Sequence, residues 1–292
     1  MSNILGSAIH IALLVAATTA HTISSTPPRI AQESSDHLLR SQEKEKNAAQ
    51  CPAGKGVLHG PVLFNRIGLL GVASTKYAAA LITVLEVVAR LLSVFPSSLP
   101  SRTILPILLL PSPVSGNSLI STPEQSQKLL TDIFSPIFLL AVFSIFVGFT
   151  IRRNCFVEMG RFFSFTHTTL EGHQLVRSGP YGVVRHPSYT GEVFVRGGMI
   201  LLLLAPTGYA RSCGALQAHQ MVTSDELVSA LQAILFASVR VAVIFYVTWI
   251  SFNSSYLIWR APKEDDSLHE AFGKQWEGYA KEVPYRFIPY VA

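Results

Sequence analysis

Long apolar segments are the feature that most constrains how this chain can fold. Crossing the hydrocarbon core of a bilayer takes about 20 consecutive, mostly apolar residues in a helix. The longest segment is Leu227–Trp259, which as one helix would be about 50 Å long. Because that length exceeds the core, we expect the helix to tilt or to project into the cytosol. The other candidate spans are Ile4–Ala20, Tyr77–Phe95, Ile133–Ile151 and Thr190–Leu204.

The composition agrees with a membrane protein. The 292 residues are 49% hydrophobic and only 14% charged, whereas soluble domains carry about 25% charged residues. The net charge of +5 is mild, so we expect basic residues at membrane faces and no nucleic-acid partner. The three cysteines lie far apart without metal-ligand spacing, so no metal site is expected. The predicted fold is all-α: a polytopic transmembrane helical bundle of about five to six spans with a C-terminal cytosolic amphipathic helix.

The chain is expected to divide near residue 160. Residues 1–160 hold N-terminal membrane helices and polar loops, including the polar stretch Thr22–Gly60, and residues 161–292 hold the polar motifs described next. Ile4–Ala20 is interpreted either as a retained first helix or as the apolar part of a cleaved signal peptide; no Lys or Arg precedes it, which argues against the signal peptide. Arg152-Arg153 directly follow one span and indicate that this end faces the cytosol.

The first polar motif runs from His173 to Gly191. Gly179-Pro180 predicts a turn. Pro187 suits the first position of a helix, which leaves His186 just outside it. A helix start presents free N–H groups and a partial positive charge, where a carboxylate can dock. Tyr189 follows His186 by three residues, so both side chains are expected to border one pocket.

The second motif begins where the long apolar segment leaves the membrane, at Arg260 and Glu264. Pro262 predicts a new helix start with Glu264, Asp265 and Asp266 in its first turn. Apolar residues then repeat at intervals of four, four and three, which predicts one apolar stripe on a helix that lies on the membrane or packs on the bundle. The stripe consists of Leu268, Phe272, Trp276 and Tyr279.

Together these motifs resemble the isoprenylcysteine carboxyl methyltransferase family, membrane enzymes that methylate a prenylated C-terminal cysteine. The resemblance rests on His173-Gln-Leu-Val-x-Ser-Gly-x-Tyr181, on Arg185-His-Pro-Ser-Tyr189 with Gly191, and on Arg260, Glu264, Asp265 and Leu268 followed by Phe272-Gly273, Trp276, Tyr279 and Val283. It covers about Thr166–Tyr290. The Arg-His-Pro-x-Tyr element alone is also found in other membrane families, including sterol reductases.

The resemblance implies a cofactor and roles for individual residues. S-adenosyl-L-methionine would contact His173, Gln174, Leu175, Val176, Tyr181, His186, Pro187, Ser188, Tyr189 and Glu264. Arg260 would bind the substrate, and Arg260 and Glu264 would be the catalytic residues. The chain has Glu264-Asp265 where the family often has two glutamates, and Thr166 where some members have a glutamine. Residues 161–292 would then be the membrane-embedded catalytic region, in the endoplasmic reticulum membrane with the site facing the cytosol.

Two other functions fit parts of the sequence. One is a membrane methyltransferase acting on phospholipid amines or another lipid acceptor. A substrate-binding arginine suits a carboxylate acceptor better than an amine. The other is a transporter or scaffold that uses the charge pairs Glu86/Arg90 and Glu192/Arg196 inside apolar segments. A transporter would not need the two polar motifs, so the methyltransferase interpretation accounts for more of the chain.

Overall fold

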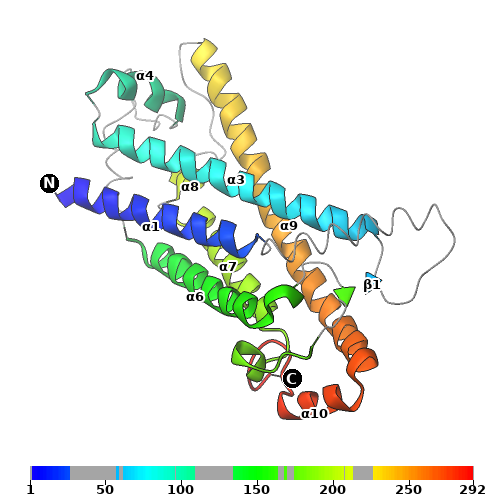
Figure 1. Cartoon of the computed structure of the whole chain (residues 1–292). Helices are drawn as coiled ribbons and strands as arrows, with labels where there is room; N and C mark the ends of the chain where they lie inside the picture. Colours follow the sequence, from blue (N-terminus) through cyan, green and yellow to red (C-terminus); the bar gives the residue numbers. More distant parts are fainter. Residues whose placement is uncertain are drawn as a thin grey trace. The chain divides into compact units, whose positions relative to one another are not determined.

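The computed structural model describes residues 2–26, 57–58, 62–95, 97–108, 134–163, 168–169, 174–206, 208–212 and 226–291. These residues are almost entirely helical (Figure 1). The α-helices are α1 (Ser2–Ser24), α3 (Val62–Val94), α4 (Leu99–Leu108), α6 (Pro136–Met159), α7 (Pro187–Leu204), α8 (Tyr209–Ser212), α9 (Glu226–Phe272) and α10 (Lys274–Glu282). Two 3-10 turns, η1 (Gly160–Phe162) and η2 (Gly179–Gly182), and two paired two-residue strands, β1 (Val57–Leu58) and β2 (Thr168–Thr169), complete the described elements.

Within the described residues, five helical stretches are long and apolar enough to cross a membrane. Each one overlaps a segment predicted from the sequence, so the expected all-α polytopic bundle is confirmed with five spans, and β1 and β2 add only a minor pairing. The predicted bounds of individual spans differ by several residues. The five stretches are Ile4–Ser24, Ala73–Val94, Pro136–Met159, Pro187–Arg211 and Ala233–Phe272.

The chain forms two compact units that alternate along the sequence. One unit comprises Met1–His21, Ser74–Phe146 and Arg196–Ile250, and the other comprises Thr22–Ala73, Val147–Val195 and Ser251–Ala292. The predicted functional boundary near residue 160 does not depend on this division and stays a prediction.

In the first unit, α1 lies between α3 and α6 (Figure 1). His10 of α1 lies 3.0 Å from Glu86 of α3 and stacks on Phe138 of α6 at a centroid distance of 4.0 Å. Glu86 also pairs with Arg90 at 3.1 Å and accepts a hydrogen bond from the Tyr209 backbone N–H. The predicted neutralisation of Glu86 by Arg90 is confirmed, and the carboxylate is fully satisfied inside the bundle.

In the second unit, α6 and α7 cross at two glycines. A Cβ atom built on Gly191 would lie 2.9 Å from the backbone oxygen of Gly148 and 2.8 Å from Cγ of Arg152. Small residues therefore let the two backbones approach closely. Beside this crossing, Arg152 of α6 forms an ion pair with Glu192 of α7 at 2.9 Å, so Glu192 has a cationic partner on another helix.

The sequence prediction at Pro262 is wrong. Pro262 does not begin a helix: α9 continues through it from Glu226 to Phe272. A proline inside a helix removes one backbone hydrogen bond and costs about 3 kcal/mol. Contacts on both sides of Pro262 offset this cost, because Ala261 and Asp265 are buried and Arg260 pairs with Glu264 across the proline.

The predicted apolar stripe does not lie on one helix. Gly273, with φ of 53°, separates α9 from α10, so Leu268 and Phe272 belong to one helix and Trp276 and Tyr279 to the next. Glycine adopts this left-handed conformation without the steric cost that a Cβ atom brings. The apolar residues keep their helical spacing across Gly273, so the boundary between α9 and α10 was not apparent from the sequence.

Candidate functional site

The site is built around the start of α7. As predicted, Pro187 is the first residue of α7 and His186 lies just outside the helix. The backbone N–H groups of Arg185 and His186 donate to the carbonyl oxygens of Tyr285 and Arg286 at 2.9 and 2.8 Å. Residues near the end of the chain are therefore fixed directly beside this turn.

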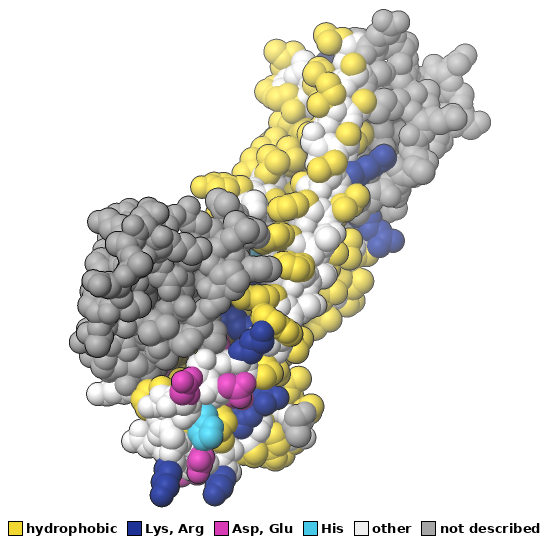
Figure 2. Space-filling view, turned by 90° about the vertical axis from the view of Figure 1, so that its right-hand side faces the viewer, with side chains coloured by type: hydrophobic (Ala, Val, Ile, Leu, Met, Phe, Trp, Pro, Cys, Tyr) yellow, Lys and Arg dark blue, Asp and Glu magenta, His cyan; other side chains and the backbone are white. Residues whose placement is uncertain are grey.

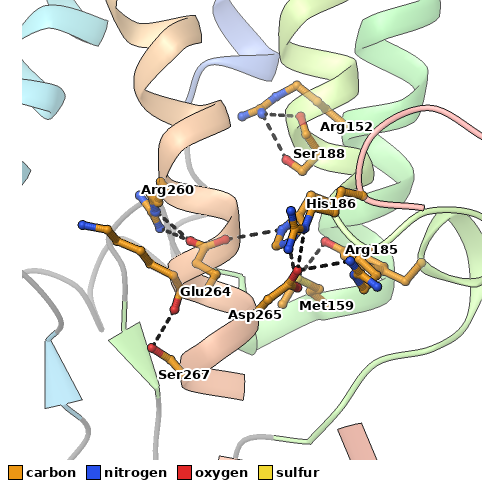
Figure 3. A network of polar contacts seen from close by, with 12 residues as sticks. Arg152, Met159, Arg185, His186, Ser188, Arg260, Glu264, Asp265 and Ser267 are labelled. Carbon is orange, nitrogen blue, oxygen red and sulfur yellow. Dashed lines mark hydrogen bonds and ion pairs between the residues drawn. The ribbon is translucent and has the colours of Figure 1, made fainter. Parts of the chain in front are cut away.

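Two adjacent carboxylates of α9 meet the His186 ring (Figure 3). His186 Nε2 lies 3.0 Å from Asp265 Oδ1, and His186 Nδ1 lies 3.5 Å from Glu264 Oε2. His186 and Asp265 are 79 positions apart in sequence. The two polar motifs of the sequence therefore converge in one place, within the second unit.

Glu264 joins His186 to Arg260. Arg260 Nε and Nη2 both lie 2.6 Å from Glu264 Oε1, and the two residues are one helical turn apart. Glu264 also interacts with Tyr189, whose ring stacks on His186 at a centroid distance of 5.4 Å. Arg260 is only 6% exposed, so its charge is little screened by water, and Glu264 supplies a counter-charge.

Asp265 has cationic neighbours from two further parts of the chain. Its Oδ2 atom lies 3.3 Å from Arg185 Nη2 and 3.0 Å from Arg286 Nε. Its other oxygen faces His186. Asp265 therefore links α9 through ion pairs to the turn before α7 and to the segment that holds Arg286.

His186 should make the stability of the protein depend on pH. Burial alone would lower the pKa of His186, but hydrogen bonds to Asp265 and Glu264 outweigh burial and raise the pKa above its ordinary value of 6.5. The stabilisation by the protonated ring is fully present below about pH 6.5 and is lost as pH rises through the raised pKa. We expect the melting temperature of purified protein in detergent to fall over that interval, and the fall to be absent from His186→Asn. The same pH dependence in both proteins would contradict this assignment.

Ser188 and Pro187 occupy positions that stabilise the start of α7. Arg152 donates from Nη1 to both the backbone oxygen and the hydroxyl of Ser188, each at 3.1 Å (Figure 3). Arg152 Nε also donates to the backbone oxygen of Ser24 at 2.9 Å. Pro187 is among the fully buried side chains. The structure therefore gives Ser188 a protein partner, whereas a cofactor contact through its side chain stays a prediction.

The remaining predicted residues lie on the approach to α7. Gln174 is exposed, Leu175 and Val176 are partly buried, and Val176 packs against a small core of Cys155, Phe163 and Tyr181. Tyr181 donates its hydroxyl to Met159 Sδ at 2.8 Å, and burial raises its pKa well above the ordinary value, so it is a neutral phenol. His173 and Thr166 lie outside the described residues, as do Cys51 and Cys213.

Three charged members of the network were not predicted as site residues: Arg185, Asp265 and Arg286. Arg185 and Asp265 each adjoin a predicted residue, His186 and Glu264. Arg286 lies between Tyr285 and Phe287 near the end of the chain. A cation between two aromatic residues was the sequence signal that could have marked it as a site residue. Among the described residues, no group of three or more His, Cys, Asp or Glu side chains is arranged to hold a metal ion.

One family model and several curated proteins match parts of this chain. The model of the isoprenylcysteine carboxyl methyltransferase (ICMT) family matches residues 139–226. Protein-S-isoprenylcysteine O-methyltransferase B of Arabidopsis thaliana is 29% identical over 151 residues, which are 50% of this chain and 56% of that protein.

Two sterol-metabolising proteins are also similar. A mouse delta(14)-sterol reductase is 28% identical over 126 residues, 43% of this chain and 22% of its own length. A probable 7-dehydrocholesterol reductase of Acanthamoeba polyphaga mimivirus is 24% identical over 174 residues, 55% of this chain and 30% of its own length.

The matched regions are partial. This chain spans less than two thirds of each of these relatives, and no solved structure matches it. The family match includes the turn before α7 and ends before Arg260. The resemblance of this chain to the isoprenylcysteine carboxyl methyltransferase family, expected from its motifs, is thereby confirmed over residues 139–226.

Proposed function

We propose that this protein transfers a methyl group from S-adenosyl-L-methionine to the C-terminal carboxylate of a prenylated cysteine. The observation that carries the proposal is the contact of His186 with Glu264, which brings the family motif at α7 to the Arg260–Glu264 pair of α9. The acceptor is either a prenylated protein or a small prenylcysteine compound. By the family resemblance, the protein would act in the endoplasmic reticulum membrane with this site facing the cytosol.

The polar groups near His186 fit the chemical groups of S-adenosyl-L-methionine. The cofactor carries an ammonium group, a carboxylate and ribose hydroxyls, so its binding site needs both acceptors and donors. Glu264 supplies an acceptor next to His186. Arg185 Nε and Trp276 Nε1 are buried donors that make no hydrogen bond within the described residues, and the Arg185 guanidinium lies 5.9 Å from the centre of the Trp276 ring. Buried donors of this kind call for an acceptor, which the cofactor's carboxylate or hydroxyls would provide.

In the proposed reaction the protein acts mainly by positioning. The cofactor supplies an electrophilic methyl group on a sulfonium. An α-carboxyl has a pKa of about 3.5, so the acceptor is already ionised and needs no general base. Arg260 would bind that carboxylate through its planar guanidinium. Glu264 would hold Arg260 in orientation through its 2.6 Å contacts, and alignment of the two reactants supplies most of the rate enhancement.

The apolar surface fits a lipid-bound acceptor. Figure 2 shows many exposed hydrophobic side chains on the face that it draws. Exposed apolar residues on α9 include Ile244, Phe252, Ile258 and Trp259, the last next to Arg260. Each buried CH₂ group contributes about 0.8 kcal/mol, so a prenyl chain would supply much of the affinity while the carboxylate determines the geometry.

A methylation assay tests the proposal directly. Purified protein in lipid vesicles is mixed with labelled S-adenosyl-L-methionine and, separately, with farnesyl-cysteine, geranylgeranyl-cysteine and phosphatidylethanolamine acceptors. We expect base-labile label, as in a methyl ester, on the prenylcysteine compounds only. Label on phosphatidylethanolamine would support the phospholipid-amine alternative. Absence of calorimetric binding of S-adenosylmethionine or S-adenosylhomocysteine would favour the transporter or scaffold.

The similarity to the two sterol reductases supports a second candidate, reduction of a sterol. Those matches cover 43% and 55% of this chain, against 50% for the methyltransferase match, but at most 30% of either reductase. The family match and the 56% coverage of the Arabidopsis protein favour methyl transfer. Incubating the protein with a reduced nicotinamide cofactor and an unsaturated sterol distinguishes the two, since only a reductase would consume the cofactor.

A further inference from the structure

We propose that Asp265 is a positioning residue for His186, and that Arg286, near the end of the chain, positions Asp265. The proposal rests on the proposed function in so far as His186 serves methyl transfer, because neither Asp265 nor Arg286 need touch the reactants. It assigns a function to the segment Tyr285–Phe287, which the sequence left without one.

The two oxygens of Asp265 have different partners. Oδ1 faces His186 Nε2 at 3.0 Å, whereas Oδ2 faces Arg286 Nε at 3.0 Å and Arg185 Nη2 at 3.3 Å. Asp265 is only 3% exposed, so the carboxylate has little freedom to rotate without losing charge-assisted hydrogen bonds. The two arginines therefore fix the orientation in which Asp265 presents Oδ1 to the imidazole.

The segment Tyr285–Phe287 is held against the same turn by its backbone. Besides the two hydrogen bonds from the N–H groups of Arg185 and His186, the Thr190 hydroxyl donates to the Phe287 carbonyl at 2.6 Å. The Phe287 ring lies 6.0 Å from the His186 ring. Arg286 thus approaches Asp265 from a backbone that is anchored on both sides, although its own side chain is 44% exposed.

The charges around His186 make the proposal testable. Glu264 and Asp265 face the ring from α9, Arg185 adjoins it in the chain, Arg286 belongs to the last segment, and the neutral Tyr189 stacks on it from α7. Arg260 acts on the ring one step away, through Glu264. Removing an anion beside an imidazole lowers its pKa, and removing a cation raises it. Loss of the Arg286 charge alone would therefore raise the pKa of His186, whereas an Asp265 carboxylate that turns away once Arg286 is gone would lower it.

The experiment is a titration of histidine-labelled, full-length protein in detergent by nuclear magnetic resonance, with the His186 signal assigned from its loss in His186→Asn. In Asp265→Asn we expect the pKa of His186 to fall by about one unit. In Arg286→Gln we expect the pKa of His186 to fall as well, but by less, because Asp265 then loses a partner that orients Oδ1 toward the ring. Arg286→Lys should restore most of the wild-type value. Lys281→Gln is the matched control, because it removes an exposed cation on α10 and should leave the pKa unchanged. The pH profile of methyl transfer should move with the same sign in each variant.

The outcomes separate this proposal from the proposed function. A rise in Arg286→Gln, which the loss of a charge alone would cause, or no shift in Asp265→Asn, would overturn the positioning roles. Falls in both variants without methyl transfer by the wild-type protein would leave the positioning intact and overturn the proposed function. Melting curves identify any variant that fails to fold, and Asp265→Asn keeps the shape of the side chain while Arg286 is nearly half exposed.

Discussion

Replacing Arg260 by alanine is expected to lower kcat/KM for methylation of a farnesyl-cysteine analogue by about 100-fold to 1,000-fold. Arg260 is the cation that would bind the acceptor carboxylate, and its Nε and Nη2 atoms are already oriented by Glu264. Without the guanidinium, the carboxylate would lose both its charge partner and its alignment with the methyl group. The measurement is the initial rate at several acceptor concentrations with purified protein.

Three further variants show which property of Arg260 accounts for the loss of activity. Arg260→Lys keeps the charge but loses the planar fork, so we expect an intermediate rate. Arg260→Ala leaves Glu264 in place without the cation, and the double variant Arg260→Ala with Glu264→Gln shows whether the carboxylate left behind causes the loss. Lys263→Gln is the matched control, since Lys263 is an exposed cation over the Trp259 ring in the same region of α9. Methylation at the wild-type rate by folded Arg260→Ala would remove Arg260 from the proposed mechanism.

The spans were predictable because they depend on a property that the sequence carries locally. A run of apolar residues of sufficient length has few folded alternatives to a membrane helix. The helix bounds were less predictable because they depend on neighbours. Pro262 illustrates this: its local preference is for a helix start, but the burial of Ala261 and Asp265 and the Arg260–Glu264 pair stabilise the helix on both sides of it.

The centre of the candidate site was predictable for a similar reason. It is marked by short-range patterns. His186 directly before Pro187 indicates a residue just outside a helix start, and Arg260 and Glu264, four positions apart, indicate neighbours on one helix face. Their roles in binding stay predictions. His186 meets α9 through Glu264 and through Asp265, the latter 79 positions away in the sequence. The motif resemblance indicated that distant pairing.

The contact between Arg286 and Asp265 was not predictable, since no local sequence pattern joins these two residues. That contact depends on the backbone hydrogen bonds that bring Tyr285 and Arg286 to the turn before α7. The sequence assigned Asp265 and Asp266 to the same helix turn, yet Asp265 is buried in the network and Asp266 is exposed. Only the rotation of α9 around its axis distinguishes these two neighbouring carboxylates.

The largest loss of stability is expected from Arg152→Ala, at about 3–5 kcal/mol of the free energy of unfolding. Arg152 is 3% exposed and contacts Ser24, Ser188 and Glu192. Its removal leaves the buried carboxylate of Glu192 without this cation and releases the first turn of α7, directly after His186. The free energy is measured by denaturing the protein with dodecyl sulfate in mixed micelles while following its circular dichroism.

Arg153→Ala is the matched control for this prediction, because it removes the neighbouring but exposed arginine and should change the free energy by less than about 0.5 kcal/mol. The double variant Arg152→Met with Glu192→Gln removes both charges, so it should recover part of the loss seen in Arg152→Ala. Equal stabilities of Arg152→Ala and Arg153→Ala would contradict the ion pair. A double variant no more stable than Arg152→Ala would instead assign the loss to the hydrogen bonds with Ser24 and Ser188, since these contacts are absent from both proteins.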